Sequence, residues 1–155
     1  KPWIQGINLD IEETVTMENI KKLINKIHSD FGENFVISMA PVSSAMESDD
    51  PGMGGFVYKE LFNSTEGKLI DFFNCQCYGS FSLETYKNII DNGYPEDKIV
   101  MGMMSGQFTD DSFVSVVHSI KEKYPDVSGF YDWEYLDAPP NKDDPSEWAK
   151  LVKTA

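Results

Sequence analysis

Three oxygen-bearing side chains, Asn8, Asp10 and Glu12, stand at every second position of one short stretch, with isoleucine or leucine at the positions between them. This period of two predicts a strand with one apolar and one polar face. A polar row that ends in carboxylic acids can donate and accept protons, which is general acid–base chemistry. In a parallel barrel, such a row points to the mouth at the carboxyl ends of the strands, where active sites lie.

Strands and helices are predicted to alternate along the whole chain. Thr16 and Ser82 precede helical apolar patterns as N-caps, and Gly32 and Gly93 follow them as stops. Further helices are expected near 58–63, from Asp110 or Asp111 to Tyr124, and over 146–154. Strands are predicted over 3–12, 35–40, 70–78, 98–103 and 128–133. Because a helix between two strands is the usual crossover of parallel strands, these units predict a parallel sheet.

Two architectures fit repeated strand–helix units, an open doubly wound sheet and a (β/α)8 barrel. No Gly-x-Gly-x-x-Gly follows the first strand and no Walker sequence occurs, so a dinucleotide-binding fold has no support. A full barrel needs about 250 residues, whereas this chain has 155. The sequence therefore predicts an α/β fold in which the chain supplies about strands 4–8 of a (β/α)8 TIM barrel, as one domain.

The composition restricts the partners. The net charge of −13 disfavours a nucleic acid or an anionic membrane, and no apolar run is long enough to span a bilayer. An uncharged polysaccharide remains compatible with this charge. Any export signal is expected upstream of this chain.

Cys75 and Cys77 lie two positions apart on a predicted strand and share one face. We expect buried free thiols packed under a helix. A Cys-x-Cys metal site is the alternative, but only two histidines accompany them, and His28 and His118 are predicted on helix surfaces. No metal and no cofactor are therefore expected.

The acidic strand resembles the signature of glycoside hydrolase family 18, the chitinases and their relatives, whose pattern is Asp-Gly-x-Asp-x-Asp-x-Glu. Gly6, Asp10 and Glu12 match this pattern, whereas Gln5 and Asn8 stand where the family has Asp. Later segments resemble strands 5–8 and the closing helix of the hevamine-class enzymes in the same order. They are 37–42, 70–78 with an Asn-x-Gln-x-Tyr row, 98–102, 129–135 with a tryptophan, and 145–149.

The resemblance implies catalytic roles for three residues. Glu12 is expected to be the general acid that protonates the leaving oxygen and then the base for water. In this family the substrate's own N-acetyl oxygen attacks the anomeric carbon, an exception to the two-carboxylate scheme. Asp10 would orient the acetamido N–H and stabilise the cation that forms, and Tyr78 would donate to the acetamido oxygen.

Four further residues are expected to bind substrate. Trp133 would form the floor on which a sugar stacks, Gln76 would contact the same sugar, and Met39 would line the wall. Asn8 can hydrogen-bond Asp10, but an amide cannot exchange a proton with it as the family's Asp does.

The resemblance implies hydrolysis of β-1,4-linked N-acetylglucosamine polymers, with chitin or its oligosaccharides as the partner and a secreted location. The alternatives are an endo-β-N-acetylglucosaminidase acting on N-glycans and a non-catalytic glycan-binding protein. The presence of Glu12 favours an enzyme, because members of the family that only bind sugars typically lack this glutamate. Because the predicted first and last strands would have unpaired edges, we expect residues 1–155 to be the C-terminal portion of a single catalytic barrel. A missing N-terminal segment or a second chain would close it.

Overall fold

The computed structural model describes residues 3–155, and its frame is a five-stranded parallel sheet in the order β1-β2-β3-β4-β5. The predicted α/β class and parallel order are confirmed. The strands are β1 (Gly6–Leu9), β2 (Val36–Met39), β3 (Phe72–Gln76), β4 (Ile99–Met104) and β5 (Gly129–Trp133).

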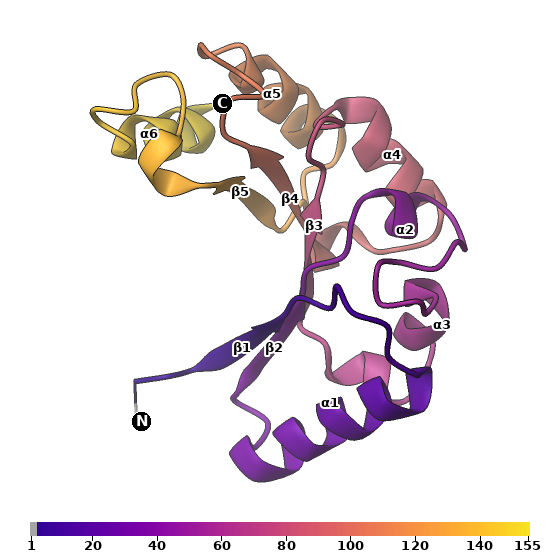
Figure 1. Cartoon of the computed structure of the whole chain (residues 1–155). Helices are drawn as coiled ribbons and strands as arrows, with labels where there is room; N and C mark the ends of the chain where they lie inside the picture. The colour runs from indigo at the N-terminus through magenta and orange to yellow at the C-terminus, as the bar shows by residue number, and fades with distance from the viewer. Residues whose placement is uncertain (1–2) are drawn as a thin grey trace.

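Helices cover one side of this sheet. Figure 1 shows the sheet as an arc with α1 to α5 along its outer side, while the inner side carries no helix over β1 to β3. The last helix, α6, packs against α5. The helices are α1 (Met17–Phe31), α2 (Ser44–Glu47), α3 (Tyr58–Phe62), α4 (Leu83–Asp91), α5 (Phe113–Lys123) and α6 (Ser146–Thr154), with 3-10 turns at Glu66–Leu69, Glu96–Lys98 and Tyr135–Asp137.

The predicted helix boundaries hold where capping residues set them. The Thr16 hydroxyl accepts from the Asn19 backbone N–H at 3.3 Å, and the Ser82 hydroxyl accepts from that of Thr85 at 3.1 Å. Gly32 and Gly93 have φ values of 84° and 90°, which glycine adopts without steric cost. The short helix α2 was not predicted, because the polar segment 42–55 has no helical period.

The first strand is shorter than the predicted 3–12. Its register with β2 ends at the pair Leu9 and Met39. The last backbone hydrogen bond to β1 runs from the Ala40 N–H to the Leu9 carbonyl oxygen, and beyond it the chain turns away from β1, because Val42 bridges to Gln76 of β3 and α2 begins at Ser44. Asp10 and Glu12 therefore lie on the loop that follows β1 and not on the strand itself.

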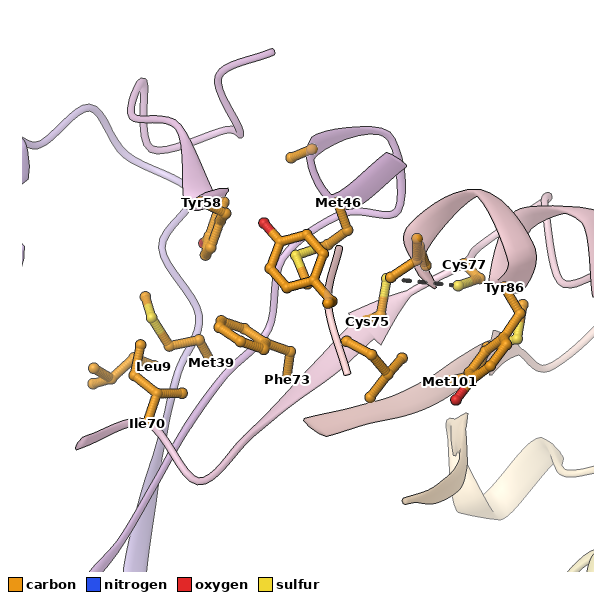
Figure 2. Close-up of a cluster of buried hydrophobic side chains, with 14 of the residues drawn as sticks. Leu9, Met39, Met46, Tyr58, Ile70, Phe73, Cys75, Cys77, Tyr86 and Met101 are labelled. Atoms are coloured by element: carbon orange, nitrogen blue, oxygen red, sulfur yellow. Dashed lines mark hydrogen bonds between the residues drawn. The ribbon is translucent and has the colours of Figure 1, made fainter. Parts of the chain in front are cut away.

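The apolar row of the strands forms the core beneath the helices. Figure 2 shows Leu9, Met39, Phe73 and Met101 gathered with side chains from α2, α3 and α4, and all of these residues are buried. The predicted buried free thiols are confirmed: Cys75 and Cys77 are fully buried and unbridged, with sulfurs 3.7 Å apart. Because side chains alternate along a strand, burying this row turns the polar row to the open face.

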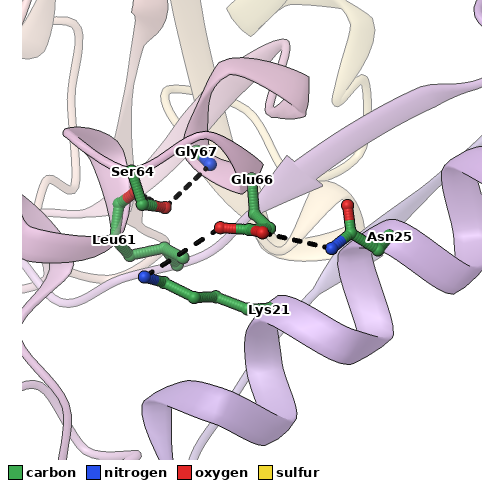
Figure 3. A network of polar contacts seen from close by, with 6 residues as sticks. All are labelled: Lys21, Asn25, Leu61, Ser64, Glu66 and Gly67. Carbon is green, nitrogen blue, oxygen red and sulfur yellow. Dashed lines mark hydrogen bonds and ion pairs between the residues drawn. The ribbon is translucent and has the colours of Figure 1, made fainter.

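A polar network ties α1 to the turn that precedes β3 (Figure 3). The Glu66 carboxylate accepts from the Asn25 side-chain N–H at 3.2 Å and pairs with Lys21 at 3.9 Å. Gly67 donates its N–H to the Ser64 hydroxyl at 3.2 Å. The position of Gly67 excludes a side chain, because an added Cβ would lie 2.1 Å from the Leu61 carbonyl oxygen. This network fixes the approach of the chain to β3.

Candidate active site

The polar row on the open face is linked across three strands. The Asn8 side-chain oxygen accepts from the Ser38 hydroxyl at 2.9 Å and from the Asn74 amide at 3.1 Å. Asn8, Ser38 and Asn74 come from β1, β2 and β3. The amide oxygen at position 8 is thus used within the protein.

Asp10 is held in place by Gln76 from the last position of β3. The Gln76 side-chain nitrogen donates to Asp10 Oδ1 at 3.1 Å and to the Ala40 carbonyl oxygen at 2.7 Å. Both N–H groups of this amide are therefore engaged. The second carboxylate oxygen of Asp10 stays available, and so does the Gln76 side-chain oxygen.

Two phenols meet beside this pair. The hydroxyl oxygens of Tyr78 and Tyr131 lie 3.4 Å apart, and the rings make an edge contact with centroids 6.5 Å apart. Burial raises the pKa of Tyr78 above its ordinary value of 10, and the nearby charge of Asp10 adds to this, against the opposing hydrogen bond from Tyr131. Burial, followed by the contact with Tyr78, also raises the pKa of Tyr131. Both phenols therefore keep their protons and can donate hydrogen bonds.

The ring of Tyr131 lies where β4 carries no side chain. Gly102 pairs with Tyr131 in the sheet register, and a Cβ added to Gly102 would lie 2.0 Å from the Tyr131 ring carbon Cζ. Glycine at this position lets the ring lie across β4 and close the base of the site.

These side chains surround a hollow of about 290 Å³ at the carboxyl ends of the strands. Ligand pockets in proteins begin at about this volume. The lining residues are Asn8, Asp10, Ala40, Asn74, Gln76, Tyr78, Tyr131 and Trp133. Trp133, at the end of β5, is 59% exposed, so its indole is open to a ligand.

Glu12 lines a neighbouring hollow. This second space, of about 560 Å³, lies between the β1–α1 loop and the start of α1, and Asp10 belongs to the lining of both. The Glu12 side chain is exposed and has no hydrogen-bond partner among residues 3–155. The catalytic role of Glu12 remains a prediction.

Met39 does not reach the hollow, and its predicted place in the wall is wrong. Its side chain is 0% exposed and belongs to the core. The register pairs Met39 with Leu9 in the apolar row, whereas Ser38 pairs with Asn8 on the open face. The alternation of β2 thus turns Ser38, and not Met39, toward the site.

Sequence reasoning missed three residues that line the hollow: Ala40, Asn74 and Tyr131. Period-two alternation would have found two of them, because Asn74 lies two residues before Gln76 and Tyr131 two residues before Trp133. No pattern in the sequence indicates Ala40, which contributes its backbone carbonyl to Gln76.

Within residues 3–155, no group of three or more histidine, cysteine, aspartate or glutamate side chains is arranged to hold a metal ion. In the same part of the chain, no helix combines the length and the apolar character needed to cross a membrane.

Comparison with known proteins gives neighbours among solved structures. No protein-family model matches the chain, and no curated protein sequence matches it. A fungal endo-β-N-acetylglucosaminidase from glycosyl hydrolase family 18 superposes with a TM-score of 0.86 at 32% identity, over 97% of this chain and 56% of that one. Chitinase ChiC from Aspergillus fumigatus has a TM-score of 0.81 at 26% identity, over 97% of this chain and 58% of that one.

A third neighbour shares the fold at lower identity. The putative chitinase A from Streptomyces coelicolor has a TM-score of 0.70 at 15% identity, over 97% of this chain and 62% of that one. The chain thus spans between 56% and 62% of the length of these three structures, as expected for part of a barrel. The structural neighbours of this chain are glycoside hydrolase family 18 proteins, and the resemblance noted in its sequence is confirmed.

Proposed function

We propose that this chain carries part of the active site of a chitinase-like glycoside hydrolase that cleaves β-1,4-linked N-acetylglucosamine with retention of configuration. One observation supports this most strongly. An acid after β1, a phenol after β3 and an indole at the end of β5 line a single hollow at the carboxyl ends of the strands. In barrel enzymes, catalytic side chains come from the ends of several different strands in this way.

In the proposed reaction, the acetamido group of the substrate is the nucleophile, and Glu12 and Asp10 assist it. Glu12 protonates the leaving oxygen, and the substrate's own acetamido oxygen attacks the anomeric carbon. Asp10 accepts a hydrogen bond from the acetamido N–H through Oδ2, because Oδ1 already accepts one from Gln76. The negative charge of Asp10 then stabilises the cation that forms. Glu12 finally removes a proton from the water that attacks the anomeric carbon, and the bond from that carbon to the acetamido oxygen breaks.

The aromatic residues supply orientation. The buried phenol of Tyr78 keeps its proton and donates to the acetamido oxygen, which turns that oxygen toward the anomeric carbon. The exposed indole of Trp133 gives the sugar an apolar platform, and such platforms with a few placed polar groups are typical of ligand sites.

An endo-β-N-acetylglucosaminidase acting on N-glycans is the second candidate. The fungal endo-β-N-acetylglucosaminidase among the structural neighbours is 32% identical to the chain. The same acid and the same acetamido-orienting residues would serve it, so only the substrate distinguishes the two functions.

Closure of the barrel is part of the proposal. Within the described residues, β1 and β5 each pair on one side only, and the apolar side chains of Ile7, Leu23 and Val36 near the β1 edge are exposed. Unpaired edges of this kind pair readily with another strand. We infer that an N-terminal barrel segment or a second chain covers this edge, with residues 1–155 as the C-terminal portion of one secreted catalytic barrel.

Hydrolysis of N-acetylchitooligosaccharides by the protein and by its Glu12→Gln variant tests the function. Glu122→Gln, a substitution of an exposed glutamate on α5, is the matched control. We expect activity to be lost in Glu12→Gln and kept in Glu122→Gln. Equal rates for all three proteins would remove Glu12 from the mechanism, binding without turnover would indicate a glycan-binding protein, and cleavage of N-glycans alone would select the second candidate.

A further inference from the structure

Ser105, the first residue after β4, contacts three consecutive residues around Trp133. Its backbone N–H donates to the Trp133 carbonyl oxygen at 2.7 Å. Its hydroxyl oxygen lies 2.7 Å from Asp132 Oδ2 and 2.8 Å from the Glu134 carbonyl oxygen. The backbone bond continues the pairing of β4 with β5, but the hydroxyl reaches beyond the last ladder pair to the residue that follows the indole.

The number of protons available for these short contacts indicates the protonation state of Asp132. A serine hydroxyl has one proton, and here it faces two acceptors at hydrogen-bonding distance. If Asp132 is ionised, one of the two acceptors has no proton to accept. If Asp132 is neutral, its O–H donates to the Ser105 oxygen, whose own O–H donates to the Glu134 carbonyl, and every short contact is then a hydrogen bond.

The surroundings of Asp132 favour the neutral acid. Its second oxygen, Oδ1, is buried and has no hydrogen-bond partner in the described part of the chain. An unpartnered buried oxygen costs more when it carries charge. Consistent with this, burial raises the pKa of Asp132, against the opposing hydrogen bonds from Ser105 and from the backbone of Trp133. An ionised Asp132 would add to the raised pKa of Tyr78 in the neighbouring hollow.

We propose that Ser105 and Asp132 are positioning residues that fix the backbone on both sides of Trp133 and so hold its indole at the hollow, with Asp132 acting as a neutral hydrogen-bond donor. Neither residue lines the hollow itself, so they act through Trp133. The effect of these two residues on sugar binding rests on the proposed function. Their effect on the position of the indole does not.

Nuclear magnetic resonance of the indole N–H groups tests the fixing of the Trp133 indole separately from sugar binding. The chain has three tryptophans, and the signal of Trp133 is identified by its loss in Trp133→Phe. In Ser105→Ala we expect the Trp133 signal to broaden or split, while the signals of Trp3 and Trp148 stay sharp. Ser105→Thr, which keeps the hydroxyl, and Asp132→Asn, whose amide can donate as the neutral acid does, are expected to keep one sharp Trp133 signal.

Ser119→Ala is the control, because this half-buried serine on α5 also donates through its hydroxyl to a backbone carbonyl. An unchanged Trp133 signal in Ser105→Ala would overturn the positioning role. A Trp133 signal in Asp132→Asn as disturbed as in Ser105→Ala would overturn the assignment of Asp132 as a neutral donor.

A titration with N-acetylchitotriose completes the test. If the proposed function holds, the Trp133 signal shifts with sugar in the unmodified protein, and Ser105→Ala weakens the affinity about tenfold, as expected for one lost hydrogen bond to a partner that positions the platform. Absence of any sugar-induced shift in the unmodified protein would count against the sugar site alone, since the comparison of the variants without sugar still decides the positioning role.

Discussion

The two faces of the sheet are built from the same five strands but perform different tasks. On the helix-covered face, Met39, Phe73 and Met101 are fully buried in one core. On the open face, Asn74 donates a hydrogen bond to Asn8 and Gln76 donates one to Asp10 around a hollow. Neighbouring residues such as Phe73 and Asn74 thus belong to different environments, because alternation sends them to opposite sides. We therefore expect the stability of the protein to depend mainly on the helix-covered face and the proposed chemistry to depend on the open face.

Truncation of two adjacent residues on β3 should affect the two faces very differently. Phe73→Ala should destabilise the protein by about 3 to 5 kcal/mol, because it leaves a cavity in the core. Asn74→Ala should cost about 1 kcal/mol, the net value of one hydrogen bond. Denaturant unfolding of both variants measures the difference. Similar losses would mean that the two faces contribute equally to stability.

A methyl group on Gly102 tests how tightly the base of the hollow is built. Gly102→Ala places a Cβ about 2.0 Å from the Tyr131 ring, and relief of such overpacking costs about 1 to 3 kcal/mol. We expect lower stability together with weaker oligosaccharide binding, measured by thermal denaturation and calorimetric titration. Unchanged values for both would show that the Tyr131 ring can move aside freely.

Gln76 tests how the open face holds Asp10. Gln76→Leu removes the hydrogen bonds to Asp10 and to the Ala40 carbonyl, so Asp10 should lose its fixed orientation. We expect the kcat of oligosaccharide hydrolysis to fall more than KM changes, with a loss of stability of about 1 kcal/mol. A rise in KM with unchanged kcat would instead assign Gln76 to sugar contact, as its sequence position suggests.

Asp132 gives a smaller effect that depends on pH. Its folded-state pKa is raised from the ordinary value of 3.8, so between that value and the raised pKa the folded protein binds more protons than the unfolded chain. Stability due to this group therefore falls as pH rises through that window. Asp132→Asn removes the dependence, so the stability of the variant relative to the unmodified protein should increase as pH rises from acid to neutral. A relative stability that decreases over this range would contradict the raised pKa.

Much of the fold was predictable because it depends on local signals. Thr16 and Ser82 set helix starts through their own hydroxyls, and the apolar periods of α1, α4 and α5 are long enough to be distinct. The limits of β1 were not predictable in this way, because they depend on where the chain after Ala40 turns away from β1 toward β3 and α2. The four-residue helix α2 is too short to show a period.

The site was predictable in type but not in detail. Alternation and the family resemblance together indicated Asp10, Tyr78, Gln76 and Trp133, which the structure brings to one hollow. Met39 was assigned to the wrong face because its neighbours gave no polar alternation from which to orient β2. The roles of Ser105 and Gly102 follow from contacts between β4 and β5, which no single-strand pattern contains.

A crystal structure of the Glu12→Gln variant with N-acetylchitotriose tests the proposed carbohydrate site directly. We predict one sugar in the hollow, stacked on Trp133, with its acetamido N–H bonded to Asp10 and its acetamido oxygen bonded to Tyr78. A sugar bound away from these three residues, or an acetamido group turned out of the hollow, would contradict the proposal that they form one carbohydrate site.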